Sequence, residues 1–84
     1  MAHVLLLYDI SHDGTRTKVA TVCEDYGLDR VQYSAFHGRL ARTHQEELML
    51  LIGQLMKNQP GRVQLIPVST NNWANRLEVI HEPA

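Results

Sequence analysis

The segment Val4-Leu5-Leu6-Leu7-Tyr8-Asp9-Ile10 is a hydrophobic run that carries a carboxylate near its end. A run of β-branched and aliphatic residues of this length predicts a strand covered on both faces, and such strands rarely contain aspartate. The polar loop Ser11-His12-Asp13-Gly14 follows directly. We therefore expect Asp9 at the carboxyl end of a buried strand, where sheets in folds that mix helices and strands commonly present functional side chains.

The Asp9 carboxylate has two interpretations that its position alone leaves open. Carboxylate and hydroxyl oxygens suit Mg²⁺ or Mn²⁺, which keep several waters and need few protein ligands. One chain supplies too few such ligands here, but two Asp9 side chains that face each other across a two-fold axis could share one ion for phosphodiester hydrolysis. The spacing alone favours the other interpretation, in which Asp9 caps the loop or the next helix.

The residues that follow predict a helix and then extended structure. Residues 15–26 place apolar side chains at helical spacing, and Asp13 or Thr15 is expected to cap the start of this helix. Residues 31–40 alternate in the manner of a strand. They form either one strand or a hairpin that Gly38 divides, and the sequence leaves both possibilities open.

The second half of the chain repeats the pattern of helix and strand. A second helix is predicted over residues 43–57, and strands are predicted over residues 63–68 and 76–80, joined by a polar, turn-like segment. The fold class that this order predicts is α+β, with a ferredoxin-like split βαβ sheet, both helices on one face and an extra C-terminal strand. We expect a single domain over residues 1–84, with residues 76–84 as edge strand and tail.

Length and composition favour a homodimer. The chain has 84 residues, of which 44% are hydrophobic, and a chain this short buries a modest core. The surplus strand is expected to pair with a sheet edge of a second copy. The single cysteine, Cys23, excludes an internal disulfide, and no apolar stretch approaches the ~18 residues of a membrane span. We expect a soluble cytoplasmic protein without a membrane partner.

The charge of the chain is balanced overall but unevenly distributed. A formal net charge of −1 is not typical of a protein that binds nucleic acid through bulk charge. Basic residues gather in the first half, either as a basic face or as ordinary solvated side chains: Arg16, Lys18, Arg30, Arg39 and Arg42. Guanidinium groups bind phosphates, and exposed rings stack on bases, so Tyr33, Phe36 and Trp73 complete a weak signal for nucleic-acid binding. Aromatic residues in alternating strands more often belong to the core.

The five histidines and the cysteine give less specific signals. No two histidines have the spacing of a zinc site, so a zinc site is not expected. His12 and His37 are candidate acids or bases if the fold brings them beside Asp9, although surface histidines without a role are commoner. Cys23 lies on the apolar stripe of its helix, which disfavours a cysteine hydrolase.

Four segments together resemble a known family. They are Leu7-Tyr8-Asp9-Ile10-Ser11, Arg16-Thr17-Lys18-Val19, Glu24-Asp25-Tyr26-Gly27-Leu28 and Arg30-Val31-Gln32-Tyr33-Ser34-Ala35-Phe36-His37-Gly38. In these segments and their separations the chain resembles the second of the two universal CRISPR-associated adaptation proteins. The resemblance extends over nearly the whole chain.

The resemblance implies a ferredoxin-like homodimer with a shared metal site. The aspartate that matches Asp9 comes from both subunits to flank a divalent metal, Mg²⁺ or Mn²⁺, and Tyr8 joins Asp9 in the catalytic set. Arg16, Arg30 and Phe36 match nucleic-acid contacts. Lys18 replaces a second arginine of the family and is also expected to contact nucleic acid, although an ammonium group cannot bind a phosphate bidentately as a guanidinium does. Arg39, from the basic group, is a further expected contact. The chain has His37 where relatives often have glutamate.

Two functions follow from the resemblance, and a third is more remote. In the first, the protein takes part in spacer acquisition as a metal-dependent endonuclease that acts on single-stranded RNA or double-stranded DNA. In the second, it is a non-catalytic scaffold that holds protospacer DNA between dimers of an integrase partner. The remote alternative is a toxin-type endoribonuclease of similar fold, whose expression alone would stop growth.

Overall fold

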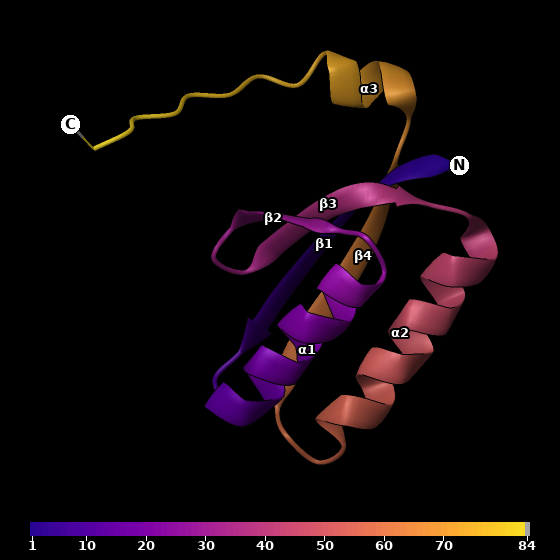
Figure 1. Cartoon of the computed structure of the whole chain (residues 1–84), viewed down its shortest axis with the longest axis vertical. Coiled ribbons are helices and arrows are strands. Elements are labelled where there is room, and N and C mark those ends of the chain that lie inside the picture. Colours follow the sequence, from indigo (N-terminus) through magenta and orange to yellow (C-terminus); the bar gives the residue numbers. More distant parts are fainter. Residues whose placement is uncertain (84) are drawn as a thin grey trace.

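The hydrophobic run forms a central strand of the sheet, with only one face buried. In the computed structural model, which describes residues 1–83, β1 spans Ala2–Ile10 (Figure 1). Its even-numbered side chains are buried in the core: Val4, Leu6, Tyr8 and Ile10. Leu5 and Leu7 are half-buried and Asp9 is exposed, so the expectation of a strand covered on both faces is wrong.

The sheet has four antiparallel strands. The other three are β2 at Asp29–Gln32, β3 at Ala35–Leu40 and β4 at Gly61–Val68, and the spatial order is β2-β3-β1-β4. β1 pairs antiparallel with both β3 and β4. This is the predicted ferredoxin-like arrangement, and the outer edge of β4 has no partner strand within residues 1–83.

Two helices cover one face of the sheet. α1 spans Asp13–Asp25 and α2 spans Arg42–Met56, and they lie side by side in front of the strands (Figure 1). Their buried residues meet the even-numbered side chains of β1 in one core: Val19, Ala20, Cys23, Leu48 and Ile52. Burial raises the pKa of the Cys23 thiol to about 12, so this cysteine stays protonated at neutral pH. The placement of both helices on one face confirms the prediction.

The hairpin in residues 31–40 is divided at Tyr33 and Ser34 rather than at Gly38. These two residues form the turn between β2 and β3. Gly38 lies inside β3, where a methyl group would stand 2.4 Å from Cδ2 of the Leu28 side chain. The absence of a side chain at Gly38 therefore lets Leu28 pack closely against β3. A glycine within a strand can indicate either such a close approach or a bend, and the sequence does not distinguish the two.

The C-terminal segment differs from the prediction. The turn-like segment forms a short helix, α3, at Thr70–Ala74, capped by the Ser69 side chain. Residues 76–80 form no strand, because α3 leads the chain away from the sheet and no strand edge within residues 1–83 lies beside it (Figure 1). Residue 84 of the predicted tail lies outside the described residues.

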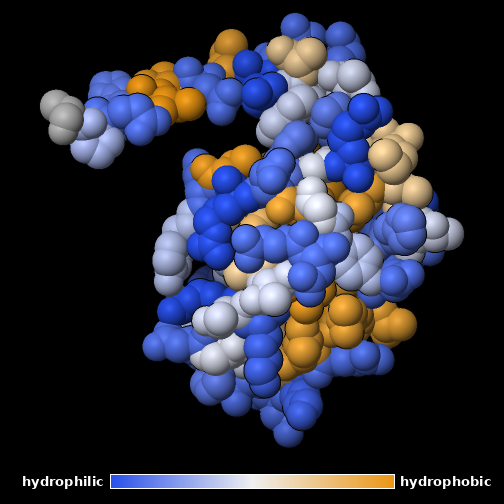
Figure 2. All heavy atoms as spheres, in the orientation of Figure 1, coloured by the Kyte–Doolittle hydropathy of each residue, from blue (hydrophilic) through white to orange (hydrophobic). Residues whose placement is uncertain are grey.

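The segment after α3 exposes large apolar side chains. Leu77 is 98% exposed, Val79 86% and Ile80 67%. Figure 2 shows apolar atoms along this segment, which projects from the body of the molecule. Apolar residues of this size are normally covered, so the segment has the composition of a strand that lacks its partner.

Across residues 1–83, none of the helices combines the length and the apolar character that crossing a bilayer requires.

Candidate nucleic-acid and metal site

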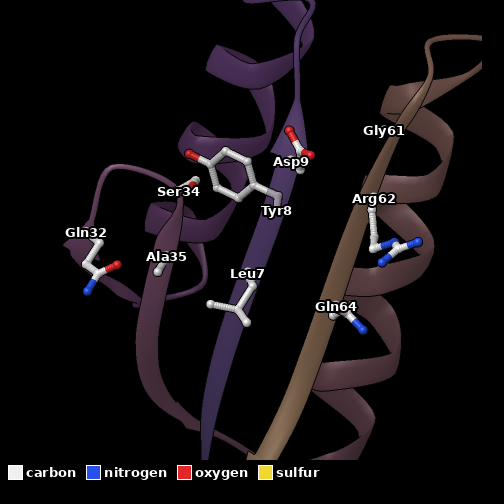
Figure 3. Close-up of a pocket in the computed structure, with 9 residues that line it drawn as sticks. All are labelled: Leu7, Tyr8, Asp9, Gln32, Ser34, Ala35, Gly61, Arg62 and Gln64. Carbon is white, nitrogen blue, oxygen red and sulfur yellow. The ribbon is translucent and has the colours of Figure 1, made fainter.

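Asp9 projects from the uncovered face of the sheet, at the carboxyl end of β1. Its antiparallel partner in β4 is Arg62, but none of the ion pairs within residues 1–83 includes Asp9. The carboxylate lines an open hollow of about 610 Å³ together with residues of all four strands and the β2–β3 turn. Figure 3 shows Asp9, Arg62 and Gln64 on the two neighbouring strands β1 and β4, with Ser34 across the hollow. The carboxylate is thus accessible to a ligand.

A second, smaller hollow joins Asp9 to the basic residues. It has a volume of about 230 Å³ and is lined by Asp9, Ser11, Arg16, Tyr33 and Ser34, among others. A carboxylate and a guanidinium group therefore border the same small space. This combination suits a phosphodiester, because the guanidinium can bind phosphate oxygens while the carboxylate holds a cation.

Arg16 is fixed by two contacts at the start of α1. Its Nη1 donates a hydrogen bond to the carbonyl of Ile10 at 3.2 Å, and its Nη2 pairs with the carboxylate of Asp13. The guanidinium group is therefore held next to the end of β1 before any ligand binds, which limits the entropy that binding would remove.

Tyr8 lies on the opposite face of β1 from Asp9. It is 5% exposed, and its hydroxyl donates to the backbone carbonyl of Tyr33 at 3.3 Å. Burial raises the pKa of the Tyr8 hydroxyl above its ordinary value, so the group remains a proton donor at neutral pH. The hydroxyl thus anchors the β2–β3 turn that borders the Asp9 hollow.

Arg30 and Phe36 are adjacent, but only Arg30 reaches the surface. Arg30 Nη1 also donates to the carbonyl of Tyr33, at 3.0 Å, and its guanidinium carbon lies 5.1 Å from the centre of the Phe36 ring. Phe36 is 0% exposed. The structure corrects the assignment of Phe36 to nucleic-acid contact, because its ring is part of the core under Arg30 and Tyr8.

Lys18 and Arg39 lie apart from this group. Lys18 is exposed on α1 and lines neither of the hollows next to Asp9. Arg39 pairs in register with His3, at the start of β1, and donates to the carbonyl of Met1 at 3.5 Å. Asp9 lies at the other end of β1, so Arg39 is separated from it. Of the predicted contacts, Arg16 and Arg30 lie together.

The histidines have local partners away from Asp9. The Nδ1 atom of His12 accepts a hydrogen bond from the backbone N–H of Thr15 at 3.1 Å, so His12 caps α1 in place of Asp13 or Thr15. His37 lies in β3 opposite Leu5, with its Nε2 atom 3.0 Å from Nδ1 of His3. The hypothesis that either histidine acts beside Asp9 finds no support in this arrangement.

One copy offers a single exposed carboxylate, that of Asp9, at the position of the predicted metal site. Within residues 1–83, no group of three or more histidine, cysteine, aspartate or glutamate side chains is placed to hold a metal ion. The exposed carboxylate of Asp9 is one hard oxygen donor of the kind that Mg²⁺ and Mn²⁺ prefer. A second copy of Asp9 would supply the other carboxylate.

Two polar residues of the larger hollow, Arg62 and Gln64, were not identified from the sequence. Both come from β4, where they pair in register with Asp9 and Leu7 of β1. The alternation of the strand around residue 64 shows which side chains share a face, but not which strand of the sheet lies beside β1. Their proximity to Asp9 can therefore be recognised only when the order of strands in the sheet is known.

Comparison with known proteins identifies similar sequences over nearly the whole chain. The family model described as CRISPR associated protein Cas2 matches residues 1–76. The chain is 46% identical over 72 residues to the "CRISPR-associated endoribonuclease Cas2 2" of Chloroflexus aurantiacus, a match that covers 86% of this chain and 85% of that protein. It is 28% identical over 81 residues to a "CRISPR-associated endonuclease Cas1/endonuclease Cas2 fusion" of Thermoproteus tenax, covering 96% of this chain and 31% of the fusion.

The fold is also similar to solved structures. Cas2 of Streptococcus pyogenes superposes with a TM-score of 0.78 at 23% sequence identity, covering 94% of this chain and 99% of that one. At this identity the likeness supports the fold alone.

Proposed function

The chain belongs to the Cas2 family of CRISPR-associated proteins, and on this basis we propose that it takes part in CRISPR spacer acquisition in the cytoplasm. We assign to it a metal-dependent cleavage of nucleic-acid phosphodiester bonds by a homodimer. The observation that carries the assignment is the exposed carboxylate of Asp9, which shares a hollow with the fixed guanidinium of Arg16. The name of the Chloroflexus relative, an endoribonuclease, favours RNA as one substrate.

Each copy contributes one half of the proposed catalytic centre. The two Asp9 carboxylates would hold Mg²⁺ or Mn²⁺ if the uncovered faces of two copies met. The cation would supply Lewis acidity for phosphodiester hydrolysis. Arg16 and Arg30 bind the phosphate and stabilise the negative charge that develops on its oxygens. Tyr8 holds the β2–β3 turn that forms the wall of the site.

Two features support pairing of copies. The outer edge of β4 lacks a partner strand within residues 1–83, and the apolar segment that includes Leu77, Val79 and Ile80 is uncovered. Addition of the segment from one copy to the β4 edge of the other satisfies backbone groups on both. Contact between the two copies would also cover the half-buried Leu5 and Leu7 of β1 and the exposed Ile66 of β4.

Replacement of Asp9 tests the catalytic assignment. Asp9→Asn keeps the size and polarity of the side chain but removes the charge that holds the cation. We expect cleavage of single-stranded RNA in Mg²⁺ or Mn²⁺ to disappear, while sedimentation shows an intact dimer. Asp25→Asn, which neutralises an exposed carboxylate at the end of α1, is the matched control and should cleave normally. Cleavage by the Asp9→Asn protein at the wild-type rate would refute the mechanism.

A scaffold function is the second candidate, and two observations favour it. A single copy supplies only one carboxylate at the end of β1, and the matching Thermoproteus protein joins a Cas1 endonuclease and a Cas2 endonuclease in one chain. In this function Arg16 and Arg30 contact the backbone of duplex protospacer DNA without breaking it, and the apolar C-terminal segment binds the integrase.

The scaffold function predicts a different result for the same variant. Spacer acquisition in cells should be unaffected by Asp9→Asn but should end when residues 77–84 are removed. Duplex binding by the purified protein should weaken steeply with salt and depend little on sequence. Acquisition that continues without residues 77–84 would exclude this segment as the docking element, and acquisition lost in Asp9→Asn would favour the nuclease.

A further inference from the structure

Of the three aromatic rings that the sequence offers for stacking, Tyr33 is the one most open to a ligand. Phe36 is 0% exposed. The Trp73 ring is already occupied, since the centre of the His37 ring lies 3.6 Å away in a stacked arrangement and the guanidinium carbon of Arg76 lies at 4.0 Å. Tyr33 is 68% exposed at the β2–β3 turn. A large aromatic side chain at an exposed turn contributes little to the core, so its ring is available for another contact.

Two guanidinium groups lie over the Tyr33 ring at a distance. The guanidinium carbon of Arg16 lies 5.6 Å from the ring centre and that of Arg30 lies 6.0 Å away. Both distances are well above the 4.0 Å that separates Arg76 from Trp73. Tyr33 nevertheless remains 68% exposed, so part of its ring is accessible to a planar group, and both cations lie close enough to bind a phosphate attached to that group.

The backbone under the ring is held in place before a ligand arrives. The carbonyl of Tyr33 accepts hydrogen bonds from the hydroxyl of Tyr8 at 3.3 Å and from Nη1 of Arg30 at 3.0 Å. Arg16 is itself fixed by the carbonyl of Ile10. Because the ring and the two cations are already positioned, binding costs little conformational entropy. Little of the favourable free energy of stacking is therefore offset.

Tyr33 also borders two hollows. One, of about 230 Å³, contains Asp9 and Arg16, and the other, also about 230 Å³, lies against α1 and is lined by Arg30 and Glu24, among others. The Glu24 carboxylate repels a phosphate from its part of the second hollow. The phosphate of a base stacked on Tyr33 would therefore be bound by Arg16 and Arg30, away from Glu24.

From these contacts we propose that Tyr33, between Arg16 and Arg30, is a stacking site for one unpaired base, and that it selects single-stranded nucleic acid next to Asp9. Bases in a duplex stack on one another and present only their edges, whereas an unpaired base presents the face that an aromatic ring can bind. Stacking on a ring tolerates any base, so the site distinguishes strandedness rather than sequence. The inference rests on the proposed nucleic-acid function but not on cleavage.

Binding by variants of Tyr33 tests the inference. All measurements use an Asp9→Asn background, so that cleavage does not contribute. Fluorescence anisotropy gives the Kd for a labelled single-stranded RNA, for the single-stranded DNA of the same sequence and for its duplex. Tyr33→Ala should raise the Kd for both single strands by about 5- to 140-fold, the range for loss of one base stacked on an aromatic side chain. The duplex Kd should not change.

Tyr33→Phe is the matched control, because it keeps the ring and removes only the hydroxyl. It should bind both single strands with the Kd of the protein that retains Tyr33. Quenching of 2-aminopurine fluorescence in a single-stranded probe provides a second readout of stacking. Quenching should occur with Tyr33 and with Tyr33→Phe alike, and it should be absent with Tyr33→Ala, whose side chain offers no ring.

Three results would overturn the inference. The first is equal weakening of single-strand and duplex binding by Tyr33→Ala, which would make Tyr33 part of a general binding surface. The second is single-strand binding that does not change in Tyr33→Ala. The third is duplex binding by the Asp9→Asn protein without single-strand binding, which would leave the scaffold function standing and the stacking site refuted. Failure to bind either form would count against the proposed nucleic-acid function itself.

Discussion

At the scale of single residues, the strand that carries Asp9 divides two roles between neighbouring side chains. Tyr8 faces the core and anchors the carbonyl of Tyr33, whereas Asp9 faces the uncovered side of the sheet. The alternation of a strand requires this division, because successive side chains point to opposite faces. Adjacency in sequence therefore does not make Tyr8 and Asp9 a catalytic pair.

A substitution at Gly38 is expected to destabilise the fold. A methyl group there would stand 2.4 Å from Cδ2 of Leu28, which is only 3% exposed and has little room to move. Gly38→Ala should lower the free energy of unfolding by about 1–3 kcal/mol, the usual effect of overpacking a core. Urea unfolding at a fixed protein concentration measures the change.

Gly53→Ala is the matched control for that experiment. Gly53 lies in α2 with nothing within 4 Å of the position that a methyl group would take. Alanine is the better helix former, so this variant should gain about 0.5–1 kcal/mol. A Gly38→Ala protein as stable as the wild type would show that β3 and Leu28 have room that the structure does not indicate.

At the scale of elements, α3 is attached to the sheet by a stack of rings. Trp73 lies on His37, and His37 lies beside His3, on the face of the sheet opposite α1 and α2. Burial lowers the pKa of His37 below its ordinary value, and the charges of His3 and Arg76 lower it further, while Asp29 opposes them. The folded chain therefore favours the neutral form of His37.

This attachment should weaken in acid. Because the folded pKa of His37 lies below the unfolded value of 6.5, its contribution is complete above pH 6.5 and is lost as pH falls through the folded pKa. Trp73 is the single tryptophan of the chain, so its fluorescence reports the contact directly. We expect its emission to change as pH falls below 6.5.

The matched variant for the fluorescence titration is His37→Gln, which keeps a planar polar group but does not titrate. Its tryptophan emission should vary much less over the same pH range. A transition of wild-type size in His37→Gln would mean that another group controls α3.

The periodicity of the sequence predicted most of these elements. The predictions that failed concern features that periodicity does not report, such as helix caps and strand partners. Apolar spacing located both long helices, a hydrophobic run located β1, and the apolar segment after the breakers at residues 58–61 located β4, because each pattern reports burial by a neighbouring layer. The same patterns could not show that His12 caps α1, since histidine is uncommon at that position, or that residues 69–75 contain a helix. Alternation also predicted a strand over residues 76–80, but a strand needs a partner edge, which residues 1–83 of one copy do not place beside it.

The candidate site was predictable to the extent that it lies within one segment. Asp9 stands out because a carboxylate interrupts a hydrophobic run, and Arg16 follows in the first turn of the next helix. Arg62 meets Asp9 only through the pairing of β1 with β4. Phe36 illustrates the opposite error, since the family resemblance assigned its ring to nucleic-acid contact, whereas aromatic residues in alternating strands usually belong to the core, as this one does.

At the scale of the whole molecule, the uncovered segment after α3 is expected to control assembly. Burial of large apolar side chains such as Leu77, Val79 and Ile80 stabilises a complex by about 1.5–3 kcal/mol each when the burial is complete. Removal of residues 77–84 should therefore convert the dimer to a monomer in sedimentation experiments at micromolar concentration. The remaining chain keeps every element of the sheet and the core.

A shorter truncation distinguishes the loss of the apolar side chains from the mere shortening of the chain. Removal of residues 82–84 leaves the three apolar side chains in place, and this protein should remain dimeric. A dimer of normal stability without residues 77–84 would show that the uncovered face of the sheet assembles by itself.

Calorimetric titration of the dimer with Mn²⁺ would show whether two copies of Asp9 share one divalent cation. We expect one ion for every two chains and no binding at this site in Asp9→Asn, with the dimer intact in both proteins. One ion for every chain, or the same stoichiometry and affinity in Asp9→Asn, would contradict this expectation.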